Sequence, residues 1–247
     1  VSAGAEAITS AVPALYGHQV AISVTIVLLL MMLNLRGLRE SASFLLFPVY
    51  TFILVISLLI VVGLYNIVTG AVPLQATALP GAAVPGVSIA LILRAFSSGS
   101  SSLTGVEAIS NAVPFFKKPR AKNAAATLTM MALILGFFFV GITFINYWYG
   151  IVPEKEVTVL SQIGKAVFGH GILYYVLQFA TALILAVAAN TGFSAFPVLA
   201  YNLAKDKFMP HMYQDRGDRL GYSNGIITLA LGSIVLLFIF HGSTERL

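Results

Sequence analysis

The sequence predicts an all-α protein that crosses a membrane several times. Of its 247 residues, 58% are hydrophobic and only 9% are charged, and the mean hydropathy is +0.92. A soluble domain of this size could not bury so much apolar surface. The apolar residues also fall into runs of roughly 20, each long enough as a helix to cross a hydrocarbon core of about 30 Å. Lipid is therefore the expected solvent for most of the chain.

Seven apolar segments are expected to lie in the membrane. They are the partial span 1–15 and the spans 20–35, 42–69, 87–116, 124–149, 172–203 and 223–241. The first run has neither an initiator methionine nor the charge pattern of a signal peptide, so it reads as the tail of a helix already under way. We expect a single transmembrane domain over 1–247 that is a fragment of a longer protein.

Basic residues gather in alternate loops and so predict the orientation. Ten of the fourteen lie in three loops, as Arg36 and Arg39, then Lys117, Lys118, Arg120 and Lys122, then Lys205, Lys207, Arg216 and Arg219. The intervening loops carry few charges, so the positive-inside rule places the basic loops in the cytoplasm. The net charge of +5 is then a membrane signal, and no nucleic-acid partner is expected.

The outer loop 151–170 contains its own helical pattern. Val157, Leu160, Ile163 and Val167 recur at helical spacing. This spacing predicts a short amphipathic helix across the outer face. Such a helix would either pack on the surface or act as a lid.

The span 87–116 departs from the apolar pattern at its middle. Five serines and one glycine fill 97–102. Serine and glycine are mediocre helix formers, so we expect local unwinding near 97–104 between two half-helices. Broken helices at membrane depth line polar cavities and mark the central site of many transporters. The candidate substrate or ion contacts are Ser98, Gly99, Ser100, Ser101, Thr104 and Gly105. Close packing of helices through small residues is the alternative.

Glu107 is the candidate for proton exchange. It follows Thr104 by three residues, so both side chains would project from the same face of the second half-helix, with Thr104 as N-cap. An ionised carboxylate there gains from the positive helix end but loses hydration, and intramembrane acids are functional suspects. A capping box in which the glutamate only ties down a backbone N–H is an equal and compatible interpretation.

Two further charged residues have no assigned role. Glu6 lies in the stretch GAEAITSAVP, which resembles GVEAISNAVP around Glu107. The two sequences diverge directly after these stretches, so convergence is favoured over a domain repeat. Arg94 lies some seven residues into the span 87–116, where it would either extend outward or pair with a carboxylate.

A second polar stretch, AANTGFSAFP, interrupts the span 172–203. Its Asn190, Thr191 and Ser194 place amide and hydroxyl oxygens near one another, which could complete a site for a hard cation. Ordinary hydrogen bonds between helices, or a kink at Pro197, are favoured over that site.

Other chemistries find no support in the sequence. The chain has no cysteine, and it has no phosphate-binding GxxxxGK[ST] loop, dinucleotide fingerprint or HExxH motif. The four histidines lie far apart at predicted loops or span ends. We therefore expect neither an enzyme nor a cofactor.

Three segments carry a family resemblance: NLRGLRESA (34–42), LTGVEAISNAVPFFKKP (103–119), and ANTGFSAFPVLA together with RGDRLGYSNG (189–225). They resemble amino acid–polyamine–organocation (APC) permeases, and among these most closely the KimA-type potassium importers. The resemblance implies the LeuT fold, with two inverted five-helix repeats and substrate held at the unwound middles of helices one and six. The chain would correspond to the end of helix three through helix nine.

The resemblance also implies a function and two site residues. It makes Thr104 a potassium ligand, Glu107 the proton-coupling residue, and the activity proton-coupled potassium uptake across a bacterial cell membrane. Helices one, two and ten, with further ligands, would lie outside this chain. So would a cytosolic domain that binds a cyclic dinucleotide and supports a homodimer. An amino-acid permease is the alternative, and a channel-like or sensor protein is a third possibility.

Overall fold

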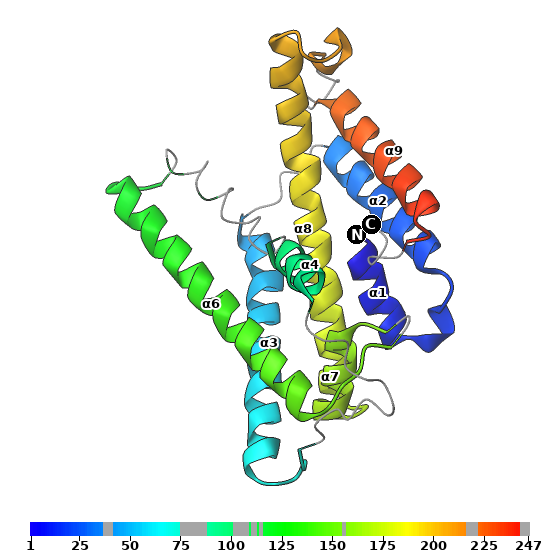
Figure 1. The fold of residues 1–247 in the computed structure, drawn as a ribbon. Helices are drawn as coiled ribbons and strands as arrows, with labels where there is room; N and C mark the ends of the chain where they lie inside the picture. The colour runs from blue at the N-terminus through cyan, green and yellow to red at the C-terminus, as the bar shows by residue number, and fades with distance from the viewer. Residues whose placement is uncertain are drawn as a thin grey trace. The chain divides into compact units, whose positions relative to one another are not determined.

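The computed structural model describes residues 1–36, 42–74, 88–100, 109, 113, 116–154, 157–215 and 222–242. These residues form helices joined by turns and short loops (Figure 1). The α-helices are α1 (Ser2–Ala11), α2 (Gln19–Leu35), α3 (Ala42–Val68), α4 (Ile89–Ser100), α6 (Arg120–Trp148), α7 (Val159–Phe168), α8 (Ile172–Lys205) and α9 (Ser223–Ile239). Two 3₁₀ turns, η1 (Pro13–Leu15) and η4 (His211–Tyr213), follow α1 and α8.

Three of the described helices, α3, α6 and α8, are long and apolar enough to cross a membrane. α2 and α9 have 17 residues each, or about 25 Å at 1.5 Å per residue, slightly less than the hydrocarbon thickness of about 30 Å. The expectation of an all-α protein with several membrane-crossing helices is confirmed.

The helix boundaries agree with the predicted spans to within a few residues, except at the first span and at 87–116, of which the structure describes the helix Ile89–Ser100 and little beyond it. At the first span α1 ends at Ala11, and the expected partial span 1–15 is completed by the 3₁₀ turn η1. Val12 is extended, with φ −125° and ψ 92°. The residue before a proline is pushed out of the helical region, so Pro13 explains why α1 stops where it does.

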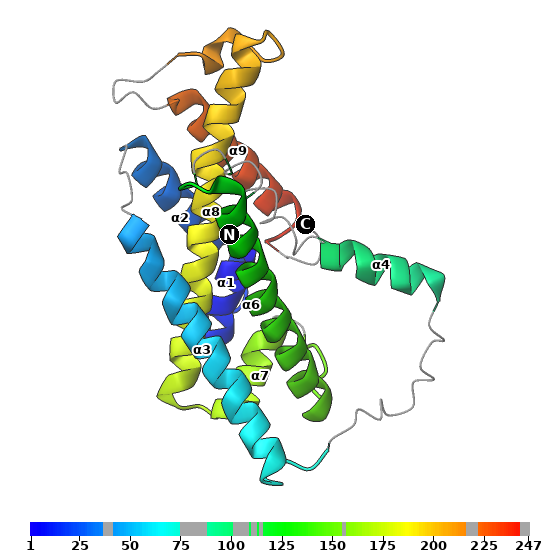
Figure 2. The same cartoon turned by 90° about the vertical axis from the view of Figure 1, so that its left-hand side faces the viewer.

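The contacts divide the chain into two units, which are described separately. The first consists of Val1–Thr69 and Ile151–Leu247, and the second of Gly70–Gly150. In the first unit α1, α3, α7 and α9 all contact α8, while α2 packs against α9 and α1. Figures 1 and 2 show α8, in yellow, as the long helix of this unit. That the whole chain forms one transmembrane domain stays a prediction.

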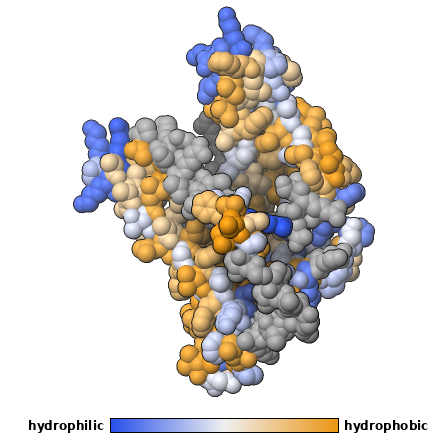
Figure 3. All heavy atoms as spheres, in the orientation of Figure 1, coloured by the Kyte–Doolittle hydropathy of each residue, from blue (hydrophilic) through white to orange (hydrophobic). Residues whose placement is uncertain are grey.

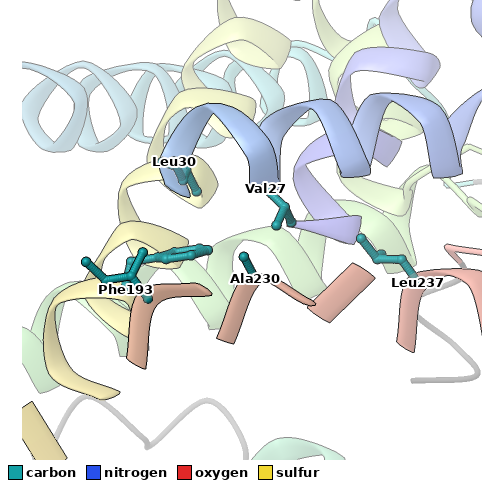
Figure 4. Packing of buried hydrophobic residues seen from close by; sticks show 6 residues of the cluster. Val27, Leu30, Phe193, Ala230 and Leu237 are labelled. Atoms are coloured by element: carbon teal, nitrogen blue, oxygen red, sulfur yellow. The ribbon is translucent and has the colours of Figure 1, made fainter. Parts of the chain in front are cut away.

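A hydrophobic cluster joins α2, α8 and α9. Its buried members are Val27, Leu30, Phe193, Ile226, Ala230 and Leu237. In Figure 4 the side chains of Val27 and Leu30 on α2 lie over Ala230 and Leu237 on α9, with Phe193 of α8 closing one end. This cluster determines which face of α8 packs against α2 and α9.

Gly225 of α9 lies against α8 at Pro197. A Cβ atom placed on Gly225 would come within 2.8 Å of the Pro197 Cα and 2.9 Å of its Cβ. Only a glycine permits so close an approach of the two helices.

The second unit contains α4 and α6. The Trp148 Nε1–H near the end of α6 donates a hydrogen bond to the Val72 carbonyl at 3.2 Å, which ties the loop after α3 to this helix. Large apolar side chains along α6 are exposed, including Met130, Leu133, Phe139 and Val140. An apolar exterior of this kind suits a lipid environment.

Candidate functional site

The expected helix break is the first candidate site, and the structure describes only its beginning. Ser98, Gly99 and Ser100 lie in the last turn of α4, whose helix continues to Ser100. The described part of the stretch 97–104 is therefore helical, and unwinding further along this stretch stays a prediction, because residues 101–108 lie outside the described residues. Ser101, Thr104, Gly105 and Glu107 lie outside the described residues, so their roles stay predictions.

The hydroxyl of Ser100 shows why a serine-rich stretch can remain helical. Its Oγ donates a hydrogen bond to the Phe96 carbonyl, four residues earlier, at 2.8 Å. The helix's own backbone therefore satisfies the hydroxyl, and no unwound segment is needed to do so. Arg94 is exposed on the same helix.

In the second candidate, on α8, all three polar side chains make hydrogen bonds within the protein. Asn190 Oδ1 accepts a hydrogen bond from Asn34 Nδ2 of α2 at 2.6 Å. The Thr191 Oγ1 donates to the Ala188 carbonyl at 2.6 Å, and the Ser194 Oγ donates to the Asn190 carbonyl at 3.2 Å. The Asn34–Asn190 contact is a hydrogen bond between helices, the kind favoured over a cation site, whereas the other two bonds lie within α8. A role of Asn190, Thr191 and Ser194 in ion binding stays a prediction.

Asn34 is a hydrogen-bond partner of the second candidate that sequence reasoning did not identify. Its Nδ2 also donates to the Leu30 carbonyl at 2.8 Å, so both amide hydrogens are used. The available signal was an amide side chain at the end of an apolar span. That signal does not name its partner, which is 156 residues away in the chain.

Loss of either asparagine is expected to weaken the contact between α2 and α8. In Asn34→Leu, Asn190→Leu and the double variant, a double-mutant cycle on unfolding should give a coupling of about 0.6 kcal/mol and at most about 1.7 kcal/mol, as for hydrogen bonds between membrane helices. Thr191→Val, on the same helix, should show no coupling with Asn34→Leu. A coupling indistinguishable from zero for the asparagine pair would contradict the hydrogen bond.

A second buried polar group, which sequence reasoning missed, lies where α1, α7 and α8 meet. We call its members, Ser10, Ser161, Tyr174 and Gln178, the polar chain. The Tyr174 hydroxyl donates to the Ser10 carbonyl at 2.9 Å and lies 2.8 Å from the Ser161 Oγ. The Gln178 Nε2 donates to the same Ser161 Oγ. The four side chains are at most 5% exposed.

The polar chain positions the outer helix α7. Thr158 caps this helix by accepting from the Ser161 N–H at 3.2 Å, and the Thr158 N–H donates to the Ser10 Oγ at 3.1 Å. On its apolar side Ile163 and Val167 are buried. The predicted amphipathic helix is thus confirmed by its bounds and its buried face, and it packs against α1, α3 and α8, while its position on the outer face stays a prediction.

One atom of the polar chain lacks a partner among the described residues. Gln178 Oε1 is buried and has no hydrogen bond there, whereas the amide nitrogen of the same side chain is bonded. A buried polar atom without a partner costs about 1–3 kcal/mol. Gln178 is therefore the point at which this network is most sensitive to change.

The comparisons with known proteins agree with the fold. The family model described as amino acid permease matches residues 1–246. The potassium transporter KimA of Bacillus subtilis (strain 168) is 55% identical over 249 residues, an alignment that covers 100% of this chain. It covers 41% of that relative, so the chain spans less than half the length of the transporter it matches.

Together with the apolar helices, these matches confirm a multi-pass protein of the cell membrane, and they support the expected partial LeuT-like fold. The chain belongs to the amino acid permease family, within the APC superfamily.

Proposed function

We propose that this chain is part of a secondary transporter that takes up potassium ions across a bacterial cell membrane. The observation that carries the proposal is the 55% identity, over the whole chain, to a protein named a potassium transporter. The alignment covers the serine-rich end of α4 and the segment 101–116, where the transport site is expected. Chemistry supports the same solute, because hydroxyl and carbonyl oxygens suit a desolvated monovalent cation.

We further propose that Thr104 binds the ion and that Glu107 couples its entry to a proton. A carboxylate next to a cation site in the membrane can bind and release a proton. The proton gradient across the membrane can then drive uptake of the cation against its own gradient. The same proposal includes regulation by a cyclic dinucleotide and assembly into a homodimer. Both would depend on a cytosolic domain that lies outside this chain.

Uptake into proteoliposomes that contain the full-length protein tests the proposal. With an imposed inward proton gradient, potassium or its analogue rubidium should accumulate against its own gradient. If neither ion accumulates under any gradient, the potassium proposal is wrong. Ion flux that never exceeds equilibrium, without accompanying proton movement, would indicate a channel.

Glu107→Gln should separate ion binding from proton coupling. The substitution keeps the shape of the side chain but removes the titratable group, so proton-driven accumulation should be lost while rubidium exchange remains. The matched control is Glu6→Gln, which changes the corresponding glutamate of GAEAITSAVP on α1. Equal losses in the two variants would contradict a specific coupling role for Glu107.

An amino-acid permease is the second candidate, and the description of the matching family favours it. In related permeases the backbone at a broken helix holds the carboxylate and ammonium groups of an amino acid. The same proteoliposomes, supplied with a mixed pool of labelled amino acids, distinguish the two. Amino-acid uptake without rubidium uptake would replace the potassium proposal with this one.

A further inference from the structure

Four cationic side chains lie at the beginning of α6. Lys117, Lys118, Arg120 and Lys122 occupy four of six consecutive positions, and all four are exposed. We call them the basic cluster. Figure 3 shows hydrophilic residues, in blue, gathered at this end of α6, next to the hydrophobic residues that follow along the helix.

The basic cluster has little negative charge near it in sequence. The unit Gly70–Gly150 contains a single acidic residue, Glu107, which lies outside the described residues. The first turn of α6 contains no acidic side chain. The loop after α8 differs, because there Asp206 separates Lys205 from Lys207. The segment that contains the basic cluster therefore has no neighbouring acidic residue that would offset the repulsion between its four positive charges.

The helix itself adds to the positive potential. Arg120 and Lys122 stand in the first turn of α6, where the helix dipole disfavours cations. The N-cap residue is Pro119, which provides no side-chain cap for the first backbone N–H groups. The Asn123 Nδ2 donates to the Lys117 carbonyl at 2.9 Å and so holds the preceding loop against this turn. An anion placed here would relieve the repulsion.

The length of α6 indicates where the basic cluster lies relative to the bilayer. Its 29 residues span about 44 Å, close to the thickness of a bilayer with its headgroup regions, about 40–45 Å. Tyr147 and Trp148 stand at the other end, as expected for an aromatic belt. The basic cluster is thus at headgroup level, in the cytoplasmic leaflet by the positive-inside rule.

We propose that the basic cluster binds the headgroups of anionic phospholipids in the cytoplasmic leaflet. Four exposed cations immediately beside a membrane-crossing helix match the charge of these lipids. Their position at the headgroup level favours a membrane lipid over a soluble anion. This proposal depends on the membrane topology of α6 and does not depend on which solute is transported.

Binding of fluorescently labelled phosphatidylglycerol to the full-length protein, in micelles of a neutral detergent, tests the proposal. Lys117→Gln/Lys118→Gln should raise the Kd roughly fivefold for each cation removed, which corresponds to about 1 kcal/mol per charge near a membrane surface. The matched control is Lys205→Gln/Lys207→Gln, which removes the same charge from another exposed loop expected on the same face. The control should leave the Kd nearly unchanged, and labelled phosphatidylcholine should bind equally to all variants.

Three results would overturn the proposal. The first is an unchanged Kd in Lys117→Gln/Lys118→Gln, and the second is an equal loss in the control variant. The third is full displacement of the labelled lipid by excess inorganic phosphate, which would show a site for small anions. Unfolding midpoints of both double variants identify a loss that comes from misfolding. In that case Lys117→Arg/Lys118→Arg, which keeps the charge, should restore lipid binding.

Discussion

Gly225→Ala is expected to destabilise the protein by about 1–3 kcal/mol, the cost of forcing additional atoms into a packed interface. The added Cβ would lie 2.8 Å from the Cα of Pro197, closer than real contacts allow. The clashing atom is backbone in α8, so a change of rotamer cannot relieve it. α9 must instead move away from α8.

This movement would also loosen the hydrophobic cluster next to the contact. Ile226 follows Gly225 directly, and Ala230 lies about one turn further along α9, and both pack in the cluster with Phe193. Separation of the helices would reduce this burial, so a larger side chain such as valine should cost more than alanine. The free energy of unfolding of the full-length protein, measured in mixed detergent and SDS micelles, is the readout.

Gly232→Ala is the matched control on the same helix. A Cβ atom at Gly232 meets nothing within 4 Å, and alanine is the better helix former by up to about 1 kcal/mol. Gly232→Ala should therefore be neutral or stabilising. If both substitutions destabilise the protein equally, the close approach of Gly225 to Pro197 is not what holds α9.

The positions of the helices could be predicted from the sequence because the bilayer imposes a minimum apolar length. α3 begins at Ala42 and α8 at Ile172, both at the predicted residues. The amphipathic pattern around Ile163 likewise predicted both α7 and the side that it buries. The position of a helix and the side that it buries depend on local composition and periodicity, and both can be read from a single sequence.

The end of α4 was harder to predict, because propensity and local hydrogen bonding act in opposite directions. Poor helix formers at 97–102 predict unwinding near 97–104, yet in the described part of this stretch Ser100 bonds to the Phe96 carbonyl within a helix. In a membrane a free hydroxyl or carbonyl is costly, so the helix can prevail over weak propensity. Composition alone does not show that the described residues up to Ser100 are helical.

The partners of buried polar groups could not be predicted, because each depends on which helices are neighbours. Asn190 interrupts an apolar helix and so is recognisable from the sequence, but its partner Asn34 is 156 positions away. Tyr174 and Ser10 are 164 positions apart. Neither pair can be read from a local pattern, and the polar chain contains no charged residue to draw attention to it.

Ser161→Ala is expected to destabilise the protein by about 2 kcal/mol, although it removes only one oxygen atom. The Gln178 Nε2 would lose its partner, and Gln178 Oε1 already has none among the described residues. The whole amide would then be buried without hydrogen bonds, which costs about 1–3 kcal/mol for each unsatisfied group. Tyr174 keeps its bond to the Ser10 carbonyl, so its contribution to the loss should be small.

Gln178→Leu should be close to neutral even though it removes a larger polar group. Leucine has a similar volume, and the substitution removes the unsatisfied oxygen together with the amide nitrogen. Ser161 keeps Tyr174 as a hydrogen-bond partner at 2.8 Å. Replacing a poorly satisfied polar group by an apolar one of similar shape is nearly neutral or stabilising. Unfolding free energies of the two single variants, measured in the same mixed micelles, should therefore differ by more than 1 kcal/mol, roughly the cost of one unsatisfied group.

The double variant Ser161→Ala/Gln178→Leu distinguishes the cost of an unsatisfied amide from the loss of a favourable bond. If the amide causes the damage in Ser161→Ala, removing it should restore most of the lost stability, and the double variant should be more stable than Ser161→Ala alone. If the hydrogen bonds of the polar chain are themselves the source of stability, the double variant should be at least as unstable as either single one. That second result would mean that the hydrogen bond between Gln178 Nε2 and Ser161 Oγ is itself stabilising and helps to hold α7 on α8.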